Sequence, residues 1–334
     1  MSINIAARFT FKKLALVATA SLIGAAPAWA VKSTNEADQY PQTPITIIIP
    51  FGAGGATDLT ARTVGKLLGE SLGQPVIFEN RAGGNSIPGT LALKGAKPDG
   101  YTLAITSNHF VANPLISDSA RYNPFTDFTH VGIVGSSPIV ISANHVNSIE
   151  DIAELRSPLK TKNLAYATGG NGTPQHLVGA ILDKKVNYGM VHIPYKGGGQ
   201  ATADVVAGHV QLLIAALPPA LPFIKDHKLK PLAVAGNKRS EFLPDTPTLQ
   251  EKGYAGIDTS VWFALVAPAG TPSAISKKLN ARLNEVLQRP ETVKVLAVQG
   301  VEPGVGDTTA ATAFLLKEQN FIAQVINDVK PSFE

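Results

Sequence analysis

The chain has 334 residues, 44% of them hydrophobic and 16% charged, which is enough for a sizeable core and for two domains. It contains no cysteine, so disulfide bonds, cysteine-ligated zinc and a thiol nucleophile are excluded. The formal net charge of +4 falls to +1 without the first thirty residues, and so small a charge gives the remainder no electrostatic reason to bind nucleic acid.

The first thirty residues have the pattern of a secretory signal peptide. Three basic residues precede an apolar run over 14–26, which is too short to span a bilayer. The sequence Ala28-Trp29-Ala30 places small residues at the −3 and −1 positions of a cleavage site. We therefore expect cleavage after Ala30 and export to the periplasm, with an uncleaved membrane anchor as the alternative.

Apolar strand-like segments then alternate with amphipathic segments, which predicts an α/β fold with parallel strands. The series begins with a strand over 45–49, a helix over 57–72 and a strand over 76–78. Further strands are expected over 103–106, 131–134, 139–142, 164–167, 191–193, 212–215, 232–235 and 262–266. Further helices are expected over 149–155, 174–182, 200–207, 272–287 and 309–329. No Pro/Gly/Ser linker divides the chain, so two domains would be joined by more than one crossing.

The turn PFGAGGATD, from Pro50 to Asp58, joins the first predicted strand to the first predicted helix. A dinucleotide fingerprint needs a third glycine where Thr57 stands, and a P-loop needs a Gly-Lys-Ser/Thr sequence that the turn lacks. The start of a helix carries free N–H groups, and Gly54 and Gly55 leave them open to a ligand because they have no Cβ. The turn therefore suits a carboxylate, and Asp58 is either part of that site or only a helix cap.

Three further polar turns follow predicted strands: ENRAGGNSIPG at 79–89, TGGNGTPQH at 168–176 and YKGGGQ at 195–200. Such turns gather at the carboxyl ends of the strands in a doubly wound sheet, where ligands bind. Within them, His176 either shapes a site or is structural, and Lys196 either meets a carboxylate or is a solvated loop residue.

Signatures of catalysis are absent from the sequence. It has no Gly-x-Ser-x-Gly elbow and no His-Glu-x-x-His motif, and its seven histidines are scattered. We therefore predict no catalytic residue, no metal site and no cofactor.

Six stretches carry a resemblance to a known family, and in chain order they are YPQTPITIIIPFGAGGATDLTAR (40–62), ENRAGGNSIPG…AKPDGYTL (79–103), TGGNGTPQHL, IPYKGGGQA, LAVAGNKRSEFLPDTPTLQEKGY and WFALVAPAGTP. Together they resemble the Bug-type periplasmic solute receptors of tripartite tricarboxylate transporters, over essentially the whole mature chain. The resemblance implies a two-lobed type II periplasmic binding protein fold. Each lobe would be a mostly parallel sheet flanked by helices, with the ligand cleft at the hinge.

The family also implies the organisation and the function. We expect one lobe over 40–141 plus 262–334 and the other over 142–261. The implied function is capture of a small organic carboxylate by closure of the cleft, and its delivery to the membrane permease subunits, by a monomer that is not an enzyme. An exported hydrolase on the same scaffold and a receptor that signals to a sensor protein are the alternatives.

The resemblance implies that loops from both lobes hold the ligand, largely through backbone N–H groups and ordered waters. Carried over to this chain, the implied ligand-binding residues are Phe51, Ala53, Gly54, Gly55, Asp58, Ser107, Asn108, Thr168, Gly169, Asn171, Thr173, Tyr195, Lys196 and Gly197.

The chain departs from the family pattern in two loops. Ser86 replaces a usual glycine and Pro88 an aliphatic residue, which predicts a stiffer second glycine-rich loop. Ala215 and Ala216 stand where the family often has Asp and a small polar residue, so a partner for the ammonium group of an amino acid is missing. We therefore add both alanines to the site and expect a dicarboxylate or an aromatic acid such as terephthalate. Trp262, Phe263 and Phe51 would extend this apolar wall if they faced the cleft.

Overall fold

A computed structural model describes residues 39–145, 149–156 and 164–329. The predicted signal peptide, 1–30, lies outside the described residues. Within the described ranges, every helix is too short or too polar to cross a membrane.

The described chain alternates strands and helices. The strands are β1 (Ile45–Ile49), β2 (Val76–Asn80), β3 (Thr102–Thr106), β4 (Phe128–Asn144), β5 (Ala165–Thr168), β6 (Val191–Pro194), β7 (Leu212–Ala216), β8 (Leu229–Val234), β9 (Ser260–Pro268) and β10 (Glu302–Pro303). The helices are α2 (Ala56–Leu72), η1 (Gly84–Ser86), α3 (Ile87–Lys94), α4 (His109–Ile116), η2 (Ile152–Arg156), α5 (Pro174–Val186), α6 (Gly198–Val206), α7 (Leu217–Lys225), α8 (Ser273–Leu287), α9 (Pro290–Val298) and α10 (Thr308–Val329). The predicted α/β class is confirmed.

The strands form one mixed sheet in the order β2-β1-β3-β9-β4-β7-β5-β6, with β8 and β10 paired to β4. The two outer groups are parallel, as predicted, since β1 pairs in parallel with β2 and β3, and β5 does so with β6 and β7. The long strands β4 and β9 run antiparallel to each other and to their other neighbours in this order, β7 and β3. Both lie between the two parallel groups, and β4 reaches the second group, since its first part pairs with β9 and its last part with β7. The predicted lobe boundaries remain a prediction.

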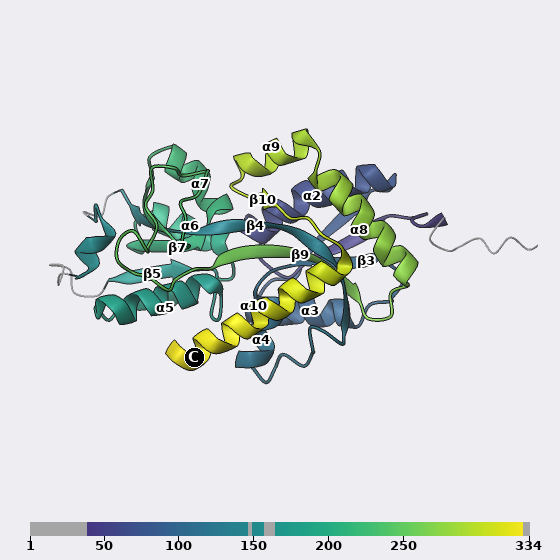
Figure 1. Cartoon of the computed structure of the whole chain (residues 1–334), viewed down its shortest axis with the longest axis horizontal. Coiled ribbons are helices and arrows are strands. Elements are labelled where there is room, and N and C mark those ends of the chain that lie inside the picture. Colours follow the sequence, from purple (N-terminus) through teal and green to yellow (C-terminus); the bar gives the residue numbers. More distant parts are fainter. Residues whose placement is uncertain (1–38, 146–148, 157–163, 330–334) are drawn as a thin grey trace, which may run out of the picture. The chain divides into compact units, whose positions relative to one another are not determined.

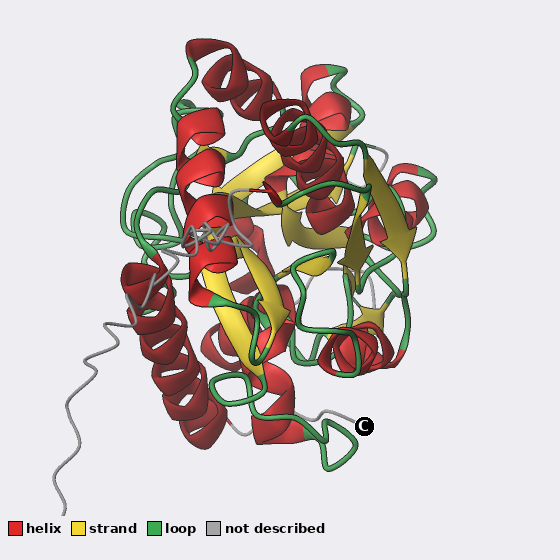
Figure 2. Ribbon diagram, turned by 90° about the vertical axis from the view of Figure 1, so that its right-hand side faces the viewer, coloured by secondary structure: helices red, strands yellow, loops and turns green. Residues whose placement is uncertain are grey.

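Helices lie on both faces of the sheet (Figure 2). Alternating side chains of the strands pack against them. In β1, Ile47 and Ile49 join a core that includes residues of α2 and α8, whereas Ile48 joins a core with residues of α3, α4 and α10. Helix α10 contacts α4 and β4 on this second face (Figure 1). The helices α6 and α7 contribute to a third core with β7.

Two predicted strands, 131–134 and 139–142, are one strand in the structure. The segment from Gly135 to Pro138 has the composition of a turn, but it pairs with β9 throughout. Register shifts around Gly132 and Gly135 accommodate the irregular residues. The predicted break is therefore wrong, because pairing with a distant strand keeps this segment extended.

Several helix predictions are also corrected. Helices α3, α4, α7 and α9 were missed. Each contains proline and has only eight or nine residues, so their sequences carry weak helix signals. The predicted helix over 272–287 begins at Ser273, with Pro272 as its N-cap, and the preceding Thr271 hydroxyl donates to the Pro268 carbonyl at 2.8 Å.

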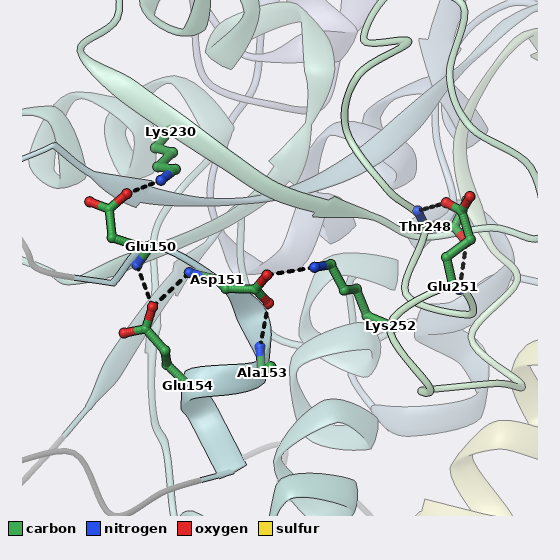
Figure 3. A network of polar contacts seen from close by, with 8 residues as sticks. All are labelled: Glu150, Asp151, Ala153, Glu154, Lys230, Thr248, Glu251 and Lys252. Atoms are coloured by element: carbon green, nitrogen blue, oxygen red, sulfur yellow. Dashed lines mark hydrogen bonds and ion pairs between the residues drawn. The ribbon is translucent and has the colours of Figure 1, made fainter.

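The predicted helix over 149–155 is the short 3₁₀ turn η2. The Glu154 carboxylate accepts hydrogen bonds from the backbone N–H groups of Glu150 and Asp151, at 3.0 and 2.9 Å. The side chains of Glu150 and Asp151 are in turn paired with Lys230 and Lys252 (Figure 3). These side-chain contacts compete with a regular helical start and hold the turn against β8 and the segment that carries Lys252.

Candidate functional site

The amino ends of five helices surround one small cavity of about 50 Å³. Each helix follows the carboxyl end of a strand: α2 follows β1, α4 follows β3, α5 follows β5, α6 follows β6 and α7 follows β7. The cavity is lined by Phe51, Gly55, Ala56, Thr57, Ser107, His109, Gly169, Thr173, Pro174, Gln175, Gly197, Gly198, Ala216, Pro219 and Val261. The sequence predicted that the turns at 50–58, 168–176 and 195–200 would gather at the strand ends, whereas it did not predict the helices α4 and α7.

This arrangement favours an anion. The first turn of a helix presents unpaired N–H groups and about half a positive elementary charge, and here five such ends meet, although Pro174 in α5 and Pro218 and Pro219 in α7 carry no N–H group. Among the described residues that line the cavity, none has a side chain of Asp, Glu, Lys or Arg. An anion would therefore be held by neutral donors, and a cationic group would find no carboxylate partner within this lining.

The first glycine-rich turn is braced by Asp58, which is 3% exposed. Its carboxylate accepts hydrogen bonds from the Gly54 N–H at 2.9 Å, from Arg62 at 2.9 Å and from Asn80 at 2.8 Å. Burial opposes ionisation, but these hydrogen bonds, with that of Arg62 foremost, hold the pKa of Asp58 below its ordinary value. Gly54 itself has φ +74°, a conformation that glycine adopts without strain.

Glycines let the turn after β1 and the turn after β6 approach each other closely. A Cβ at Gly199 would lie 2.9 Å from the backbone C and O atoms of Gly54, and one at Gly52 would lie 3.1 Å from the Lys196 carbonyl oxygen. Both distances are shorter than ordinary contacts, and the atoms involved belong to the backbone. Larger residues at Gly199 or Gly52 would therefore force the two turns apart.

The turn between β5 and α5 is stabilised by its own side chains. Thr173 caps α5, since its hydroxyl accepts from the His176 N–H at 3.0 Å and donates to the Gly170 carbonyl at 2.8 Å. The Nδ1 of His176 accepts from the Gly172 N–H at 3.2 Å. These bonds fix the loop that carries Gly169 to Gln175 on one side of the cavity.

Two stacked histidine rings pack against the same loop. The rings of His176 and His192 are stacked, with centroids 4.0 Å apart and planes at 10°, and His192 Nε2 lies 2.7 Å from the Thr168 hydroxyl. Burial lowers the pKa of His176 to about 4 and that of His192 to about 3. Both rings are therefore neutral near pH 7, and His176 has a structural place in the loop.

The structure brings seven of the sequence-predicted site residues to the cavity: Phe51, Gly55, Ser107, Gly169, Thr173, Gly197 and Ala216. Nine others lie outside its lining: Ala53, Gly54, Asp58, Asn108, Thr168, Asn171, Tyr195, Lys196 and Ala215.

The positions of several of these nine have clear causes. Asn108 is held by β9, since its amide contacts the Ser260 carbonyl and the Trp262 N–H, both at 3.3 Å. The Tyr195 hydroxyl donates to Asp204 at 2.6 Å. The side chain of Lys196 is exposed.

Of the apolar residues that the sequence predicts to form a wall of the site, some line the cavity and others lie in the cores. Ala216 lines the cavity, whereas Ala215 packs into the core with α6 and α7, because successive residues of a strand point to opposite faces. Trp262 and Phe263 are fully buried in two different cores and do not belong to the described lining, which includes Phe51 and Val261.

Eight lining residues were not predicted: Ala56, Thr57, His109, Pro174, Gln175, Gly198, Pro219 and Val261. Seven of them lie in the first turn of a helix, so the rule that ligands bind at helix starts could have found them. His109 was missed because α4 was not predicted, which left it as one histidine among seven. Among the described lining residues, none comes from the second glycine-rich turn, 79–89.

Comparison with known proteins assigns this chain to a family. The sequence profile described as "Tripartite tricarboxylate transporter family receptor" matches residues 60–330. The chain belongs to this receptor family. It is 34% identical to the protein BugT of Bordetella pertussis over 296 residues, which cover 87% of this chain and 91% of BugT.

Solved structures of similar proteins agree with the assignment. The periplasmic binding protein BugD has a TM-score of 0.83 at 30% identity and is covered over 99% of its length, with 87% of this chain. An R. palustris protein solved with adipate has a TM-score of 0.84 at 29% identity, covering 87% of this chain and 98% of its own. MatC of Rhodopseudomonas palustris, solved with bound malate, has a TM-score of 0.80 at 27% identity, covering 86% of this chain and 100% of its own. This tripartite tricarboxylate transporter receptor thus has the fold of a periplasmic binding protein.

Proposed function

We propose that this receptor captures a small organic carboxylate in the cavity at the five helix starts and delivers it to the membrane permease subunits of a tripartite transporter. The observation that carries the proposal is the convergence of five helix amino ends on one cavity whose described lining holds no charged side chain. Two structural neighbours support it, since their structures contain adipate and malate.

The lining favours a plain acid over an amino acid. A buried ammonium group without an anionic partner is costly, and Asp58 already accepts three hydrogen bonds and lies outside the lining. Ala216 offers a methyl group where the family often has a polar residue. The cavity of about 50 Å³ is a few water molecules in size, which favours a short dicarboxylate over a rigid aromatic diacid such as terephthalate.

Ligand capture would proceed by closure of two lobes, 40–141 with 262–334 and 142–261. The close approach between Gly54 and Gly199 belongs to the closed state in this proposal, because the first residue is in one predicted lobe and the second in the other. The strands β4 and β9 would carry the hinge, since both run between the two groups of parallel strands. The exported receptor would act in the periplasm as a monomer after removal of residues 1–30.

Calorimetry with the mature protein tests the proposal. We expect binding of at least one acid among succinate, adipate, citrate, benzoate and terephthalate, with no conversion of the bound acid in an NMR assay. Gly199→Ala should weaken binding at least tenfold because its methyl group keeps the two turns apart, whereas Gly95→Ala, where the nearest atom is 3.7 Å away, should bind as the parent does. Binding of aspartate or glutamate alone, or chemical turnover of any acid, would contradict the proposal.

A further inference from the structure

His109 has an unused polar atom at the cavity. It is the first residue of α4 and is 4% exposed, and its ring lies beside that of Phe51, with centroids 5.3 Å apart. It lines the cavity, and its Nε2 is buried without a hydrogen-bond partner among the described residues. A buried nitrogen without a partner is costly to fold, so its retention at a binding cavity points to a partner that arrives with the ligand.

The tautomer of this ring follows from its other contact. The ring is hydrogen-bonded to the backbone of Asn171, and this bond favours the protonated form of the ring, so the backbone group is the accepting carbonyl. Because Nε2 has no partner, the nitrogen that donates to Asn171 is Nδ1. Burial lowers the pKa of His109 to about 4, so the ring is neutral near pH 7. Nε2 therefore carries a lone pair and can only accept a hydrogen bond.

A second acceptor shares the cavity. Gln175, which is 9% exposed and belongs to the first turn of α5, also lines it, and its Oε1 is buried without a partner among the described residues. The helix starts around the cavity supply N–H donors, whereas His109 Nε2 and Gln175 Oε1 supply acceptors. A carboxylate alone can satisfy the donors but brings no hydrogen for the acceptors.

We propose that His109 selects the ligand, with Nε2 accepting a hydrogen bond from a hydroxyl group of the bound acid, so that the site prefers hydroxycarboxylates to unsubstituted carboxylates of the same length and charge. The inference rests on the proposed carboxylate-binding function of the same cavity. The carboxylate occupies the helix starts, and the hydroxyl group faces His109, with Gln175 as the second acceptor. A ligand without the hydroxyl group leaves Nε2 unsatisfied in the closed cavity.

Matched pairs of acids test the preference by calorimetry at pH 7: malate against succinate, 2-hydroxyglutarate against glutarate, and lactate against propionate. For at least one pair the hydroxy acid should bind at least about tenfold more tightly. This is the loss of affinity expected when one buried acceptor is left without a hydrogen bond. Equal affinity within every pair would overturn the inference while leaving the proposed function in place. If no acid of these pairs binds, the inference is wrong, and the proposed function is wrong as well if adipate, citrate, benzoate and terephthalate also fail to bind.

Two variants assign the preference to Nε2. His109→Asn keeps an N–H group for the Asn171 carbonyl but has no atom at Nε2, so the ratio of affinities within the selective pair should fall towards one. His109→Gln keeps a polar atom near the position of Nε2 and should retain part of the ratio, and His209→Asn, at an exposed histidine, should retain all of it. Circular dichroism and melting curves check that each variant is folded. An unchanged ratio in a folded His109→Asn, or net proton uptake on binding without a hydroxyl preference, would overturn the inference.

Discussion

The stacked pair of His176 and His192 should make this receptor lose stability in mild acid. Burial lowers the pKa of His176 from 6.5 to about 4, so the unfolded chain takes up a proton at a higher pH than the folded chain does. The full stability is present above about pH 6.5 and is lost as the pH falls through the interval towards 4. The pKa of His192 is lowered further, to about 3, by burial and by the neighbouring His176.

The size of the effect follows from the pKa of His176, whose ring is 3% exposed. A pKa that moves from 6.5 to about 4 corresponds to about 3 kcal/mol of unfolding free energy over the whole interval. Between pH 8 and pH 5.5 the same linkage removes about 1.4 kcal/mol. His176→Asn abolishes this titration while its side-chain oxygen can still accept from the Gly172 N–H. The variant should be less stable than the parent at pH 8, because it loses the ring, and the difference should shrink by about 1.4 kcal/mol at pH 5.5.

Urea unfolding at a series of pH values, without ligand, measures this difference. Trp262 is the one tryptophan left after removal of residues 1–30, so its fluorescence reports the transition. His209→Asn, which alters an exposed histidine, is the control and should follow the parent at every pH. Parallel curves for the parent and His176→Asn between pH 8 and pH 5.5 would show that the stacked ring is not the source of the acid sensitivity.

Three other substitutions have defined outcomes. Asp58→Asn should lower the unfolding free energy by about 1–3 kcal/mol at pH 7, because three donors lose a charged acceptor. This loss should become smaller as the pH falls through the lowered pKa of the Asp58 carboxyl, and denaturation at pH 7 and pH 3 measures it. Trp262→Phe removes the indole donor that lies 3.0 Å from the Glu318 carboxylate. Burial raises the pKa of Glu318, so this carboxyl is closer to neutral at pH 5 than at pH 8. The loss of stability, followed by circular dichroism, should therefore be larger at pH 8 than at pH 5. Gly179→Ala should cost about 1–3 kcal/mol, since its methyl group would lie 2.2 Å from the ring of Tyr166, and an unchanged melting temperature would contradict this packing.

The sequence alone determined the α/β class and nearly every strand. Strand and helix periods are local, so Ile45–Ile49 and Ala56–Leu72 could be recognised from their own residues, and Gly73 ends α2 at φ +71° as its sequence predicts. Long motifs in a fixed order also sufficed to indicate the family. The glycine-rich turns were placed correctly because a strand followed by a helix leaves few positions for the turn between them.

Only the tertiary structure decided which groups face the cavity. Ala215 and Ala216 are neighbours with the same side chain, yet one packs into a core and the other lines the cavity, because pairing with β4 and β5 fixes which face of β7 each one meets. Asp58 turns to Arg62 and Asn80 because β2 lies beside the turn, and the segment Gly135 to Pro138 stays extended because β9 pairs with it. The burial of the His109 ring and its hydrogen bond to Asn171 also depend on the tertiary structure. Contacts between distant residues, and not local sequence patterns, set the surroundings of a single side chain.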